Sequence, residues 1–244
     1  MNHLLHDRTD RVKLAGLLAR AILPALLCLP AAAQTPDATS DAEAAVRAIF
    51  EAYRQALMAG DGEAAASLVD RETEDYYRQL KRLVLEGGEE EVRQRAFVDR
   101  FLVVAFRHQF SGDGEFSGEE FAAMELGDVI VRAMEIGWIN SAAIEQLAVG
   151  AVRIEGIEAV AEARTRASLE DPSLAGGMDE LEYRFVNEDG RWKFRFSALV
   201  MSIDEVMRNL AAQLGADEDD LIFTLVESLT GVEVLPEVWE SQDR

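Results

Sequence analysis

The chain has 244 residues, a formal net charge of −22 at pH 7, and hydrophobic side chains at 49% of its positions. An acidic excess of this size repels the phosphate backbone of DNA and RNA, so we expect no nucleic-acid partner. The apolar content is sufficient for a packed core. The length exceeds that of one small domain but is short for two, which predicts a single domain with additional elements.

Residues 1–33 have the three-part pattern of a secretory signal peptide. Basic residues precede the apolar run Ala21–Pro30, which is followed by an Ala-rich cleavage site ending at Ala33. The apolar run is too short to cross a bilayer, so we expect no membrane span after cleavage. The pattern predicts a periplasmic or secreted mature chain that starts with a linker over residues 34–39.

The sole cysteine, Cys28, lies inside the predicted signal peptide. Leu27 occupies the position where a lipoprotein signal requires a small residue, which argues against lipid attachment at Cys28. We therefore expect a mature chain without a disulfide, a thiolate nucleophile or a cysteine metal ligand. Because the removed segment is more basic than acidic, cleavage would make the chain still more acidic.

Apolar residues at helical spacing predict four helices between residues 40 and 110. The first is expected to begin at a capping box formed by Ser40 and Glu43 and to end at Gly60. Asp61 and Thr73 are expected to cap the second and third helices. The second, third and fourth helices are predicted over residues 61–69, 73–86 and 89–110.

Three arginines share one face of the predicted helix 89–110, namely Arg93, Arg100 and Arg107. A stripe of this kind is typical of a solvated face whose members pair with nearby carboxylates. The apolar stripe of the same helix is expected to belong to the core.

The hydrophobic pattern changes from helical to alternating after two shorter helices, predicted over 117–125 and 128–136. Two strands are expected about a turn at Glu155-Gly156, over Gln146–Ile154 and Ile157–Arg166. The second strand places three alanines on one face, which leaves space above them or allows a helix to approach closely. These are Ala159, Ala161 and Ala163.

A second strand pair is predicted on either side of Asp189-Gly190. Large aromatic residues alternate with charged ones in both strands. We expect a four-residue loop that pairs Val186 with Arg191, places Phe185 opposite Trp192, and gathers the aromatic side chains on one face. The first helix is expected to cover that face with Phe50, Tyr53 and Leu57.

Two helices are predicted at the C-terminal end of the chain, within residues 202–230. Ser202 and Glu205 form a capping-box pattern at the start of one of them. Asp217 is expected to cap the other, which runs to Leu229 and has further acidic residues in its first turn, where the helix dipole favours them.

The segments Gly60-Asp61-Gly62 and Asp189–Phe194 resemble the nuclear transport factor 2-like superfamily, whose fold is a cystatin-like α+β roll. The resemblance covers about residues 41–70 and 146–200. It implies an α+β domain over residues 40–240, with a curved antiparallel sheet that forms a cone around the N-terminal helices. A helical insertion over residues 73–140 and the C-terminal helices would be additions to that fold.

The superfamily contains enzymes, such as ketosteroid isomerase and scytalone dehydratase, and many binding modules, so the fold alone does not decide the function. We expect a non-catalytic module that binds a small apolar ligand or an envelope protein through the cone. The alternative is a cofactor-free acid/base enzyme, an isomerase or dehydratase, with its site in the cone. A homodimer is compatible with both. The expected lining of the cone is Tyr53, Tyr183, Phe185, Trp192 and Phe194.

His108 is the sole histidine outside the predicted signal peptide and therefore the first candidate for a general base. Asp99 could orient it only from the same helix, where nine residues place the two side chains about 180° apart around the axis. Arg100 and the tyrosines Tyr53, Tyr76 and Tyr77 are the other candidate partners. A lone histidine on an apolar helical face is more often a packed residue, so we assign no catalytic residue.

Residues 109–120 match the later half of a calcium-binding EF-hand loop, with Asp113 at its fifth position and Glu120 at its twelfth. The first position, however, is Gln109, which leaves few anionic ligands. Ser117 and Glu120 also fit a capping box. We expect no specific metal site here. No nucleotide-binding or other cofactor motif is found in the sequence.

Overall fold

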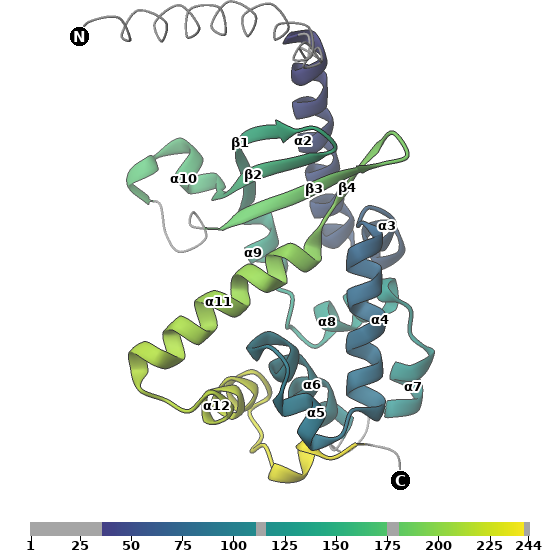
Figure 1. The fold of residues 1–244 in the computed structure, drawn as a ribbon, viewed down its shortest axis with the longest axis vertical. Coiled ribbons are helices and arrows are strands. Elements are labelled where there is room, and N and C mark those ends of the chain that lie inside the picture. The colour runs from purple at the N-terminus through teal and green to yellow at the C-terminus, as the bar shows by residue number, and fades with distance from the viewer. Residues whose placement is uncertain (1–35, 111–115, 175–180, 242–244) are drawn as a thin grey trace, which may run out of the picture. The chain divides into compact units, whose positions relative to one another are not determined.

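The computed structural model describes residues 36–110, 116–174 and 181–241, and over these residues the chain is an α+β protein (Figure 1). The predicted signal peptide and Asp113 of the candidate EF-hand loop lie outside the described residues. The helices before the first strand are α2 (Pro36–Ala59), α3 (Gly62–Ser67), α4 (Arg71–Glu86), α5 (Glu89–Arg93), α6 (Phe97–Phe110), α7 (Gly118–Ala123), α8 (Leu126–Glu135) and α9 (Ser141–Gln146).

Four strands form one antiparallel sheet in the order β1-β2-β3-β4. This confirms the predicted α+β class and the expected antiparallel strands. Leu68 and Asp70 exchange backbone hydrogen bonds with Phe194, so this short segment extends the sheet beside β4 in parallel orientation. The strands are β1 (Leu147–Glu155), β2 (Glu158–Thr165), β3 (Glu182–Glu188) and β4 (Arg191–Phe194).

The remaining elements include three that the sequence did not predict, namely α10 and two 3-10 helices. Helix α9 was not predicted either. Helix α11 leaves the end of the sheet, and α12 follows it (Figure 1). These elements are α10 (Arg166–Glu170), the 3-10 helix Pro172–Leu174, α11 (Phe196–Leu214), α12 (Glu218–Thr230) and the 3-10 helix Pro236–Trp239.

Two predicted helix starts are wrong because their capping boxes lie inside longer helices. Helix α2 begins at Pro36, so residues 36–39 are helical and not part of a linker, and Ser40 is an internal residue. Helix α11 begins at Phe196, more than one helical turn before Ser202. A Ser-x-x-Glu pattern shows that a cap could form there, but the chain continues in helical geometry wherever the preceding residues also permit it.

Two other helix boundaries also differ from the predictions. Asp70, and not Thr73, caps α4, since its Oδ1 accepts a 2.9 Å hydrogen bond from the Thr73 backbone. The segment predicted as one helix over 89–110 is divided into α5 and α6. By contrast, the structure confirms the caps expected at Asp61 and Asp217.

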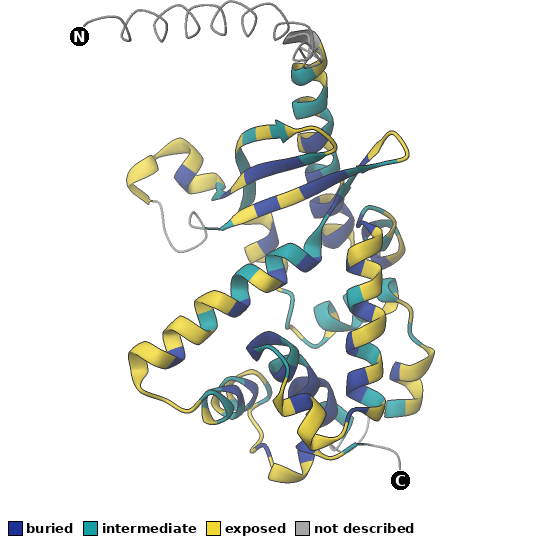
Figure 2. Ribbon diagram, in the orientation of Figure 1, coloured by how far each residue is buried: buried dark blue, intermediate teal, exposed yellow. Residues whose placement is uncertain are grey.

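The register of the β3–β4 hairpin differs from the prediction by two residues. Glu188 pairs with Arg191 and Phe185 pairs with Phe194, so the loop contains only Asp189 and Gly190. Both loop residues have positive φ, 53° and 82°, as a two-residue type I′ turn requires. The two-residue loop also places every large aromatic side chain of the hairpin on one face, so this arrangement does not require a four-residue loop. Figure 2 shows the resulting alternation of buried and exposed residues along β3.

Helix α2 packs against the aromatic face of the sheet, as expected. The Phe50 ring lies 4.7 Å from that of Tyr183, and the Tyr53 ring lies 5.1 Å from that of Phe194, measured between ring centroids. The three alanines of β2 lie in this packed layer and are buried. The small side chains therefore allow close packing there and do not leave the open space that was the other expectation.

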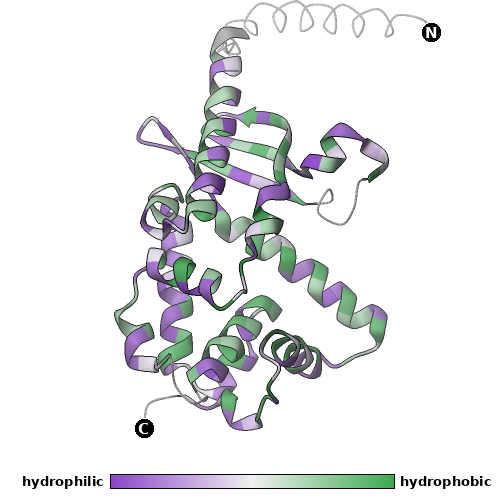
Figure 3. Ribbon diagram, turned by 180° about the vertical axis from the view of Figure 1, so that it is seen from behind, coloured by the Kyte–Doolittle hydropathy of each residue, from purple (hydrophilic) through white to green (hydrophobic). Residues whose placement is uncertain are grey.

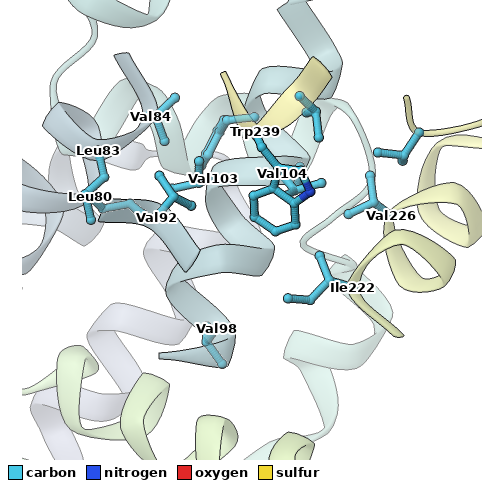
Figure 4. Close-up of a cluster of buried hydrophobic side chains, with 14 of the residues drawn as sticks. Leu80, Leu83, Val84, Val92, Val98, Val103, Val104, Ile222, Val226 and Trp239 are labelled. Carbon is cyan, nitrogen blue, oxygen red and sulfur yellow. The ribbon is translucent and has the colours of Figure 1, made fainter. Parts of the chain in front are cut away.

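The buried apolar residues form two clusters. The sheet cluster lies between α2 and the sheet, with Phe50, Tyr183 and Phe194 among its members. The helix cluster lies among α4, α6, α12 and the C-terminal 3-10 helix, with Leu83, Val104 and Trp239 among its members (Figure 4). Phe196 packs against both clusters from the first residue of α11.

The predicted arginine stripe is not a solvated face. Arg100 is largely buried and pairs with Glu218 and Asp219 at the start of α12. Arg107 is fully buried, and its guanidinium donates to backbone carbonyls at the end of α4 and in the C-terminal 3-10 helix. Only Arg93 remains substantially exposed among the three. Helix α6, which carries Arg100 and Arg107, is therefore surrounded by other elements.

Helix α11 carries apolar residues along its whole length, which Figure 3 shows from behind. Its first half packs against both clusters, but Met201, Val206 and Leu214 are exposed. Asp204 is buried on the packed side and accepts a 2.9 Å hydrogen bond from the Val98 backbone, so α11 caps the start of α6.

Helices α3 and α8 cross with their backbones in contact at a pair of glycines. A Cβ on Gly127 would lie 2.9 Å from the backbone C and O of Gly62, well inside van der Waals distance. We expect Gly127→Ala to lower the free energy of unfolding by about 2 kcal/mol, because the helices must move apart. Urea unfolding followed by circular dichroism would measure the change. Gly88→Ala is the matched control, since a Cβ there meets nothing within 4 Å, and an equal effect of both would contradict the crossing.

Candidate functional site: an apolar cavity between the two clusters

A cavity of about 470 Å³ lies where the sheet cluster and the helix cluster meet. Phe50, Tyr183 and Phe194 line it from the sheet cluster, while Leu80 and Phe106 line it from the helix cluster. Further lining side chains come from α8, α9, α11 and α12. They include Leu126, Val129, Ile130, Ala133, Ile144, Phe196, Leu199, Val200 and Leu229.

The local reason for the cavity is the shape of the elements that meet there. Helix α2 follows the sheet, and α4 begins one short connection after α3. Gly62 and Gly127 bring α8 close to α3, and α8 presents Val129, Ile130 and Ala133 to the cavity. Each cluster is well packed by itself, but the side chains at their junction do not fill the space between them.

Of the five residues predicted to line a site, three line this cavity: Tyr53, Tyr183 and Phe194. Phe185 and Trp192 are buried in the sheet cluster and are not among its lining residues. The structure thus brings all five into one apolar cluster, although Phe185 and Trp192 lie outside the cavity lining.

Most polar side chains of the lining are already engaged within the protein. The Tyr76 hydroxyl donates to Asp99 at 2.9 Å, and the Tyr77 hydroxyl donates to the Met124 carbonyl at 2.9 Å. Arg54 donates twice to Glu51, at 2.9 and 2.6 Å. Thr73 is tied by its hydroxyl to Asp70, at 2.6 Å. These contacts fix the lining but leave its polar atoms little capacity for a ligand.

The hydroxyl of Tyr183 is one exception. Tyr183 is 1% exposed, and its hydroxyl has no hydrogen-bond partner among the described residues. Burial raises the pKa of Tyr183 to about 12, so the phenol is protonated at neutral pH. Burial also raises the pKa of Tyr53, the other tyrosine that the sheet cluster contributes to the lining.

No carboxylate or histidine is found among the described residues that line the cavity. His108 lies elsewhere, with its Nε2 3.2 Å from the Thr230 hydroxyl, and burial lowers its pKa so that the neutral imidazole is favoured. Asp99 accepts from Tyr76, whose pKa is raised by burial and then by that carboxylate. Of the acid/base groups considered from the sequence, the tyrosines line the cavity, whereas His108 and Asp99 do not.

The half-matching EF-hand loop has a different role where it is described. Ser117 and Glu120 form the expected capping box at the start of α7, in which the Glu120 carboxylate accepts from the Ser117 backbone at 2.8 Å. Across residues 36–110, 116–174 and 181–241, no group of three or more His, Cys, Asp or Glu side chains is arranged to hold a metal ion.

The sequence-based list of lining residues missed the contribution of the helical insertion. Val129, Ile130 and Ala133 of α8 and Phe101 of α6 line the cavity, yet their helical spacing predicts ordinary core residues. Nothing in a helical stripe shows whether a neighbouring element fills the space opposite it. The two adjacent tyrosines of α4, Tyr76 and Tyr77, could have indicated a site on that helix, because buried hydroxyls need hydrogen-bond partners.

None of the described helices is both long and apolar enough to cross a membrane. Comparison of the chain with models of protein families found no match. The curated proteins and the solved structures likewise contain no match to it.

Proposed function

We propose that the protein is a non-catalytic module that binds a small apolar molecule in the cavity between the two clusters. The observation that carries this proposal is the cavity itself, whose volume of about 470 Å³ falls within the range of small-molecule sites. Its lining is dominated by aliphatic and aromatic side chains, with a few polar groups, as such sites generally are.

The apolar lining supports an occupant. Leu229 in the lining is half exposed, so the cavity opens to solvent and its apolar side chains face water when no ligand is bound. Apolar surface in contact with water is unfavourable by about 25 cal/mol per Å². A ligand that fills the space would remove that surface from water and recover this free energy.

The lining also favours a small ligand over the other candidates. A protein partner requires a broad exposed surface, whereas most of these side chains line a concave space and are buried or half-buried. An acid/base enzyme needs a titratable group within hydrogen-bond reach of its substrate. The described lining offers only tyrosines and Arg54, and Arg54 is neutralised by Glu51. Binding without chemistry is therefore the function that these contacts support best.

Two further parts of the proposal concern family and compartment. Membership of the nuclear transport factor 2-like superfamily, with a cone formed by the sheet and the N-terminal helices, is supported by the antiparallel sheet and by the packing of α2 on its aromatic face. Export to the periplasm or outside the cell is supported by the basic, apolar and Ala-rich segments that end at Ala33.

The binding proposal is tested with N-phenyl-1-naphthylamine, a neutral apolar dye that becomes fluorescent in apolar surroundings. Titration of the protein is expected to show saturable binding of the dye. Ala133→Phe places a large ring in the cavity lining and is expected to weaken the dye at least tenfold, because the ring occupies the space of the ligand. Competition by unlabelled hydrocarbons would establish that one site is responsible.

The matched control is Ala143→Phe, the same substitution at an exposed position of α9 outside the lining. It is expected to leave dye binding unchanged, and thermal unfolding would show that both variants are folded. An absence of saturable binding in the unsubstituted protein would contradict the proposal. So would equal affinities of the two variants for the dye.

A further inference from the structure

The outer edge of β1 has no strand beside it among the described residues. In the sheet order β1-β2-β3-β4, β1 forms one border (Figure 1), whereas at the other border Leu68 and Asp70 bond to β4. An open edge presents backbone N–H and C=O groups with which a further strand can pair, and proteins usually protect such edges. The edge of β1 is therefore a candidate interaction surface.

The first half of this edge is protected. A bulge between Val149 and Val152 interrupts the pairing with β2, and Arg47 of α2 donates to the carbonyls of Val149 and Gly150 at 3.0 and 2.7 Å. Bulges and covering elements are common protections of a sheet edge. Over residues 152–155, the described part of the chain provides no comparable contact from another element. This second half of the edge is open.

The backbone groups of Ile154 point outward from this open half. A two-residue turn joins β1 to β2, with Glu155 paired with Glu158 on either side of it. The residues that flank such a turn bond to each other, and bonded and non-bonded pairs then alternate along an antiparallel ladder. Arg153 therefore bonds to Val160, whereas the N–H and C=O of Ile154 face away from β2 and can bond to another strand.

The charged side chains of the open half are complementary to a second copy of themselves. Arg153 and Glu155 lie on the same face of β1 and are 64% and 50% exposed. They contact each other within one copy, but the guanidinium has further donors. If two copies of β1 pair in antiparallel orientation about a two-fold axis at Ile154, each Arg153 lies opposite the partner's Glu155, which is a favourable cross-strand pair.

Other registers lose this complementarity. An axis at Arg153 would place the two arginines opposite each other, and an axis at Val152 would carry the pairing into the bulge. An axis between two residues would oppose side chains that point to different faces of the sheet, which antiparallel pairing does not allow. The charges and the side-chain period thus select Ile154 as the centre.

We propose that two copies of the chain associate through the open half of the β1 edge, antiparallel and centred on Ile154. The two four-stranded sheets then form one continuous sheet, in which each Ile154 exchanges backbone hydrogen bonds with the partner's Ile154. Two Arg153–Glu155 pairs flank this centre. Residues 152–155 do not line the cavity, so this inference is independent of the proposed binding function.

The charge of the whole chain makes the association weak but does not prevent it. A net charge of −22 repels a second copy at long range. At physiological ionic strength this repulsion is screened beyond about 8 Å, whereas the Arg153–Glu155 pairs act at shorter distance. We therefore expect a reversible dimer whose population rises with protein concentration.

Analytical ultracentrifugation at physiological salt, up to a protein concentration of about 1 mM, measures this dimer. Arg153→Glu and Glu155→Arg are each expected to weaken it at least about tenfold, because like charges then lie opposite each other. Equal amounts of the two variants, when mixed, are expected to form a heterodimer, since every glutamate of one copy then faces an arginine of the other. A general effect of net charge would instead shift the two variants in opposite directions.

Arg184→Glu is the matched control. Arg184 and Glu182 form a similar exposed pair on β3, which is an internal strand of the sheet, and the substitution changes the net charge by the same amount as Arg153→Glu. It is expected to leave the dimer unchanged, and circular dichroism would show that all variants are folded.

Three results would overturn the proposal. The first is an unsubstituted protein that stays monomeric at every concentration. The second is a dimer that Arg153→Glu weakens no more than Arg184→Glu does, which would place the interface elsewhere on the chain. The third is a mixture of Arg153→Glu and Glu155→Arg that forms no heterodimer, because the two residues would then not lie opposite each other.

Discussion

Replacement of Arg107 by Met is expected to lower the free energy of unfolding by about 4 kcal/mol. Arg107 is 0% exposed, and burial lowers its pKa to about 10, so it is still charged at neutral pH. Its Nε and Nη2 donate to the Val84 and Leu83 carbonyls, both at 2.8 Å, and its Nη2 also donates to Gly87. The last carbonyls of a helix have no partner within that helix, so Arg107 caps α4 from another element.

The same guanidinium holds the C-terminal 3-10 helix. Its Nη1 donates to the Trp239 carbonyl at 2.9 Å and to the Val238 carbonyl at 3.3 Å. Met fills a similar volume but donates nothing, which leaves buried carbonyls unsatisfied at about 1–3 kcal/mol for each strongly affected group. Lys is expected to retain part of the stability, because an ammonium has donors but not the planar fork that reaches both elements.

Urea unfolding at neutral pH, followed by circular dichroism and tryptophan fluorescence, measures this effect. Arg78→Met is the control, since the side chain of Arg78 is 69% exposed and pairs with Asp75 on the same helix. We expect that control to change the free energy by less than about 1 kcal/mol. If Arg107→Met changed the free energy of unfolding as little as this control does, the guanidinium could not be the connection between α4 and the C-terminal segment.

Replacement of Phe194 by Ala is expected to cost about 3–5 kcal/mol of stability, as is typical of a buried aromatic residue. Phe194 is 1% exposed and lies at the centre of the sheet cluster. Its ring contacts those of five other aromatic residues on α2, β3 and α11. They are Phe50, Tyr53, Tyr183, Phe185 and Phe196.

Phe194→Ala also enlarges the cavity, because Phe194 belongs to the lining. The variant is therefore expected to recover part of the lost stability when the apolar dye is added in excess, by mass action on the folded state. Thermal unfolding with and without dye measures both effects. Ile157→Ala is the control in the same sheet, at an exposed turn position, and a loss as small as that of the control would contradict the central position of Phe194.

The hairpin shows how far sequence reasoning can go and where it stops. Alternation of aromatic and charged residues correctly predicts both strands and the face that is buried. It does not decide between loops of two and four residues, because both keep the same side chains on the same face. The turn chemistry decides it, since Asp189 and Gly190 adopt the positive φ angles of a type I′ turn. That signal was present in the sequence.

Arg107 shows the opposite case. Its spacing with Arg93 and Arg100 indicates a polar helical face, and no property of α6 alone predicts that this face is enclosed. The carbonyls that accept its hydrogen bonds come from two other elements, α4 and the 3-10 helix at residues 236–239. The second of these lies more than 120 positions away from Arg107 in the sequence. Only the packing of those elements makes an apolar interior able to hold a guanidinium.

The sequence by itself determined the local features whose causes are local. Helical spacing and strand alternation reflect the two side-chain periods, the helix end at Gly60 reflects its positive φ of 69°, and the caps at Asp61 and Asp217 reflect side-chain bonds within one turn. The tertiary structure alone decided that a cavity exists. Its volume is the space left between the two clusters, and its lining comes from seven helices and the sheet. The separation of those elements depends on every contact at once.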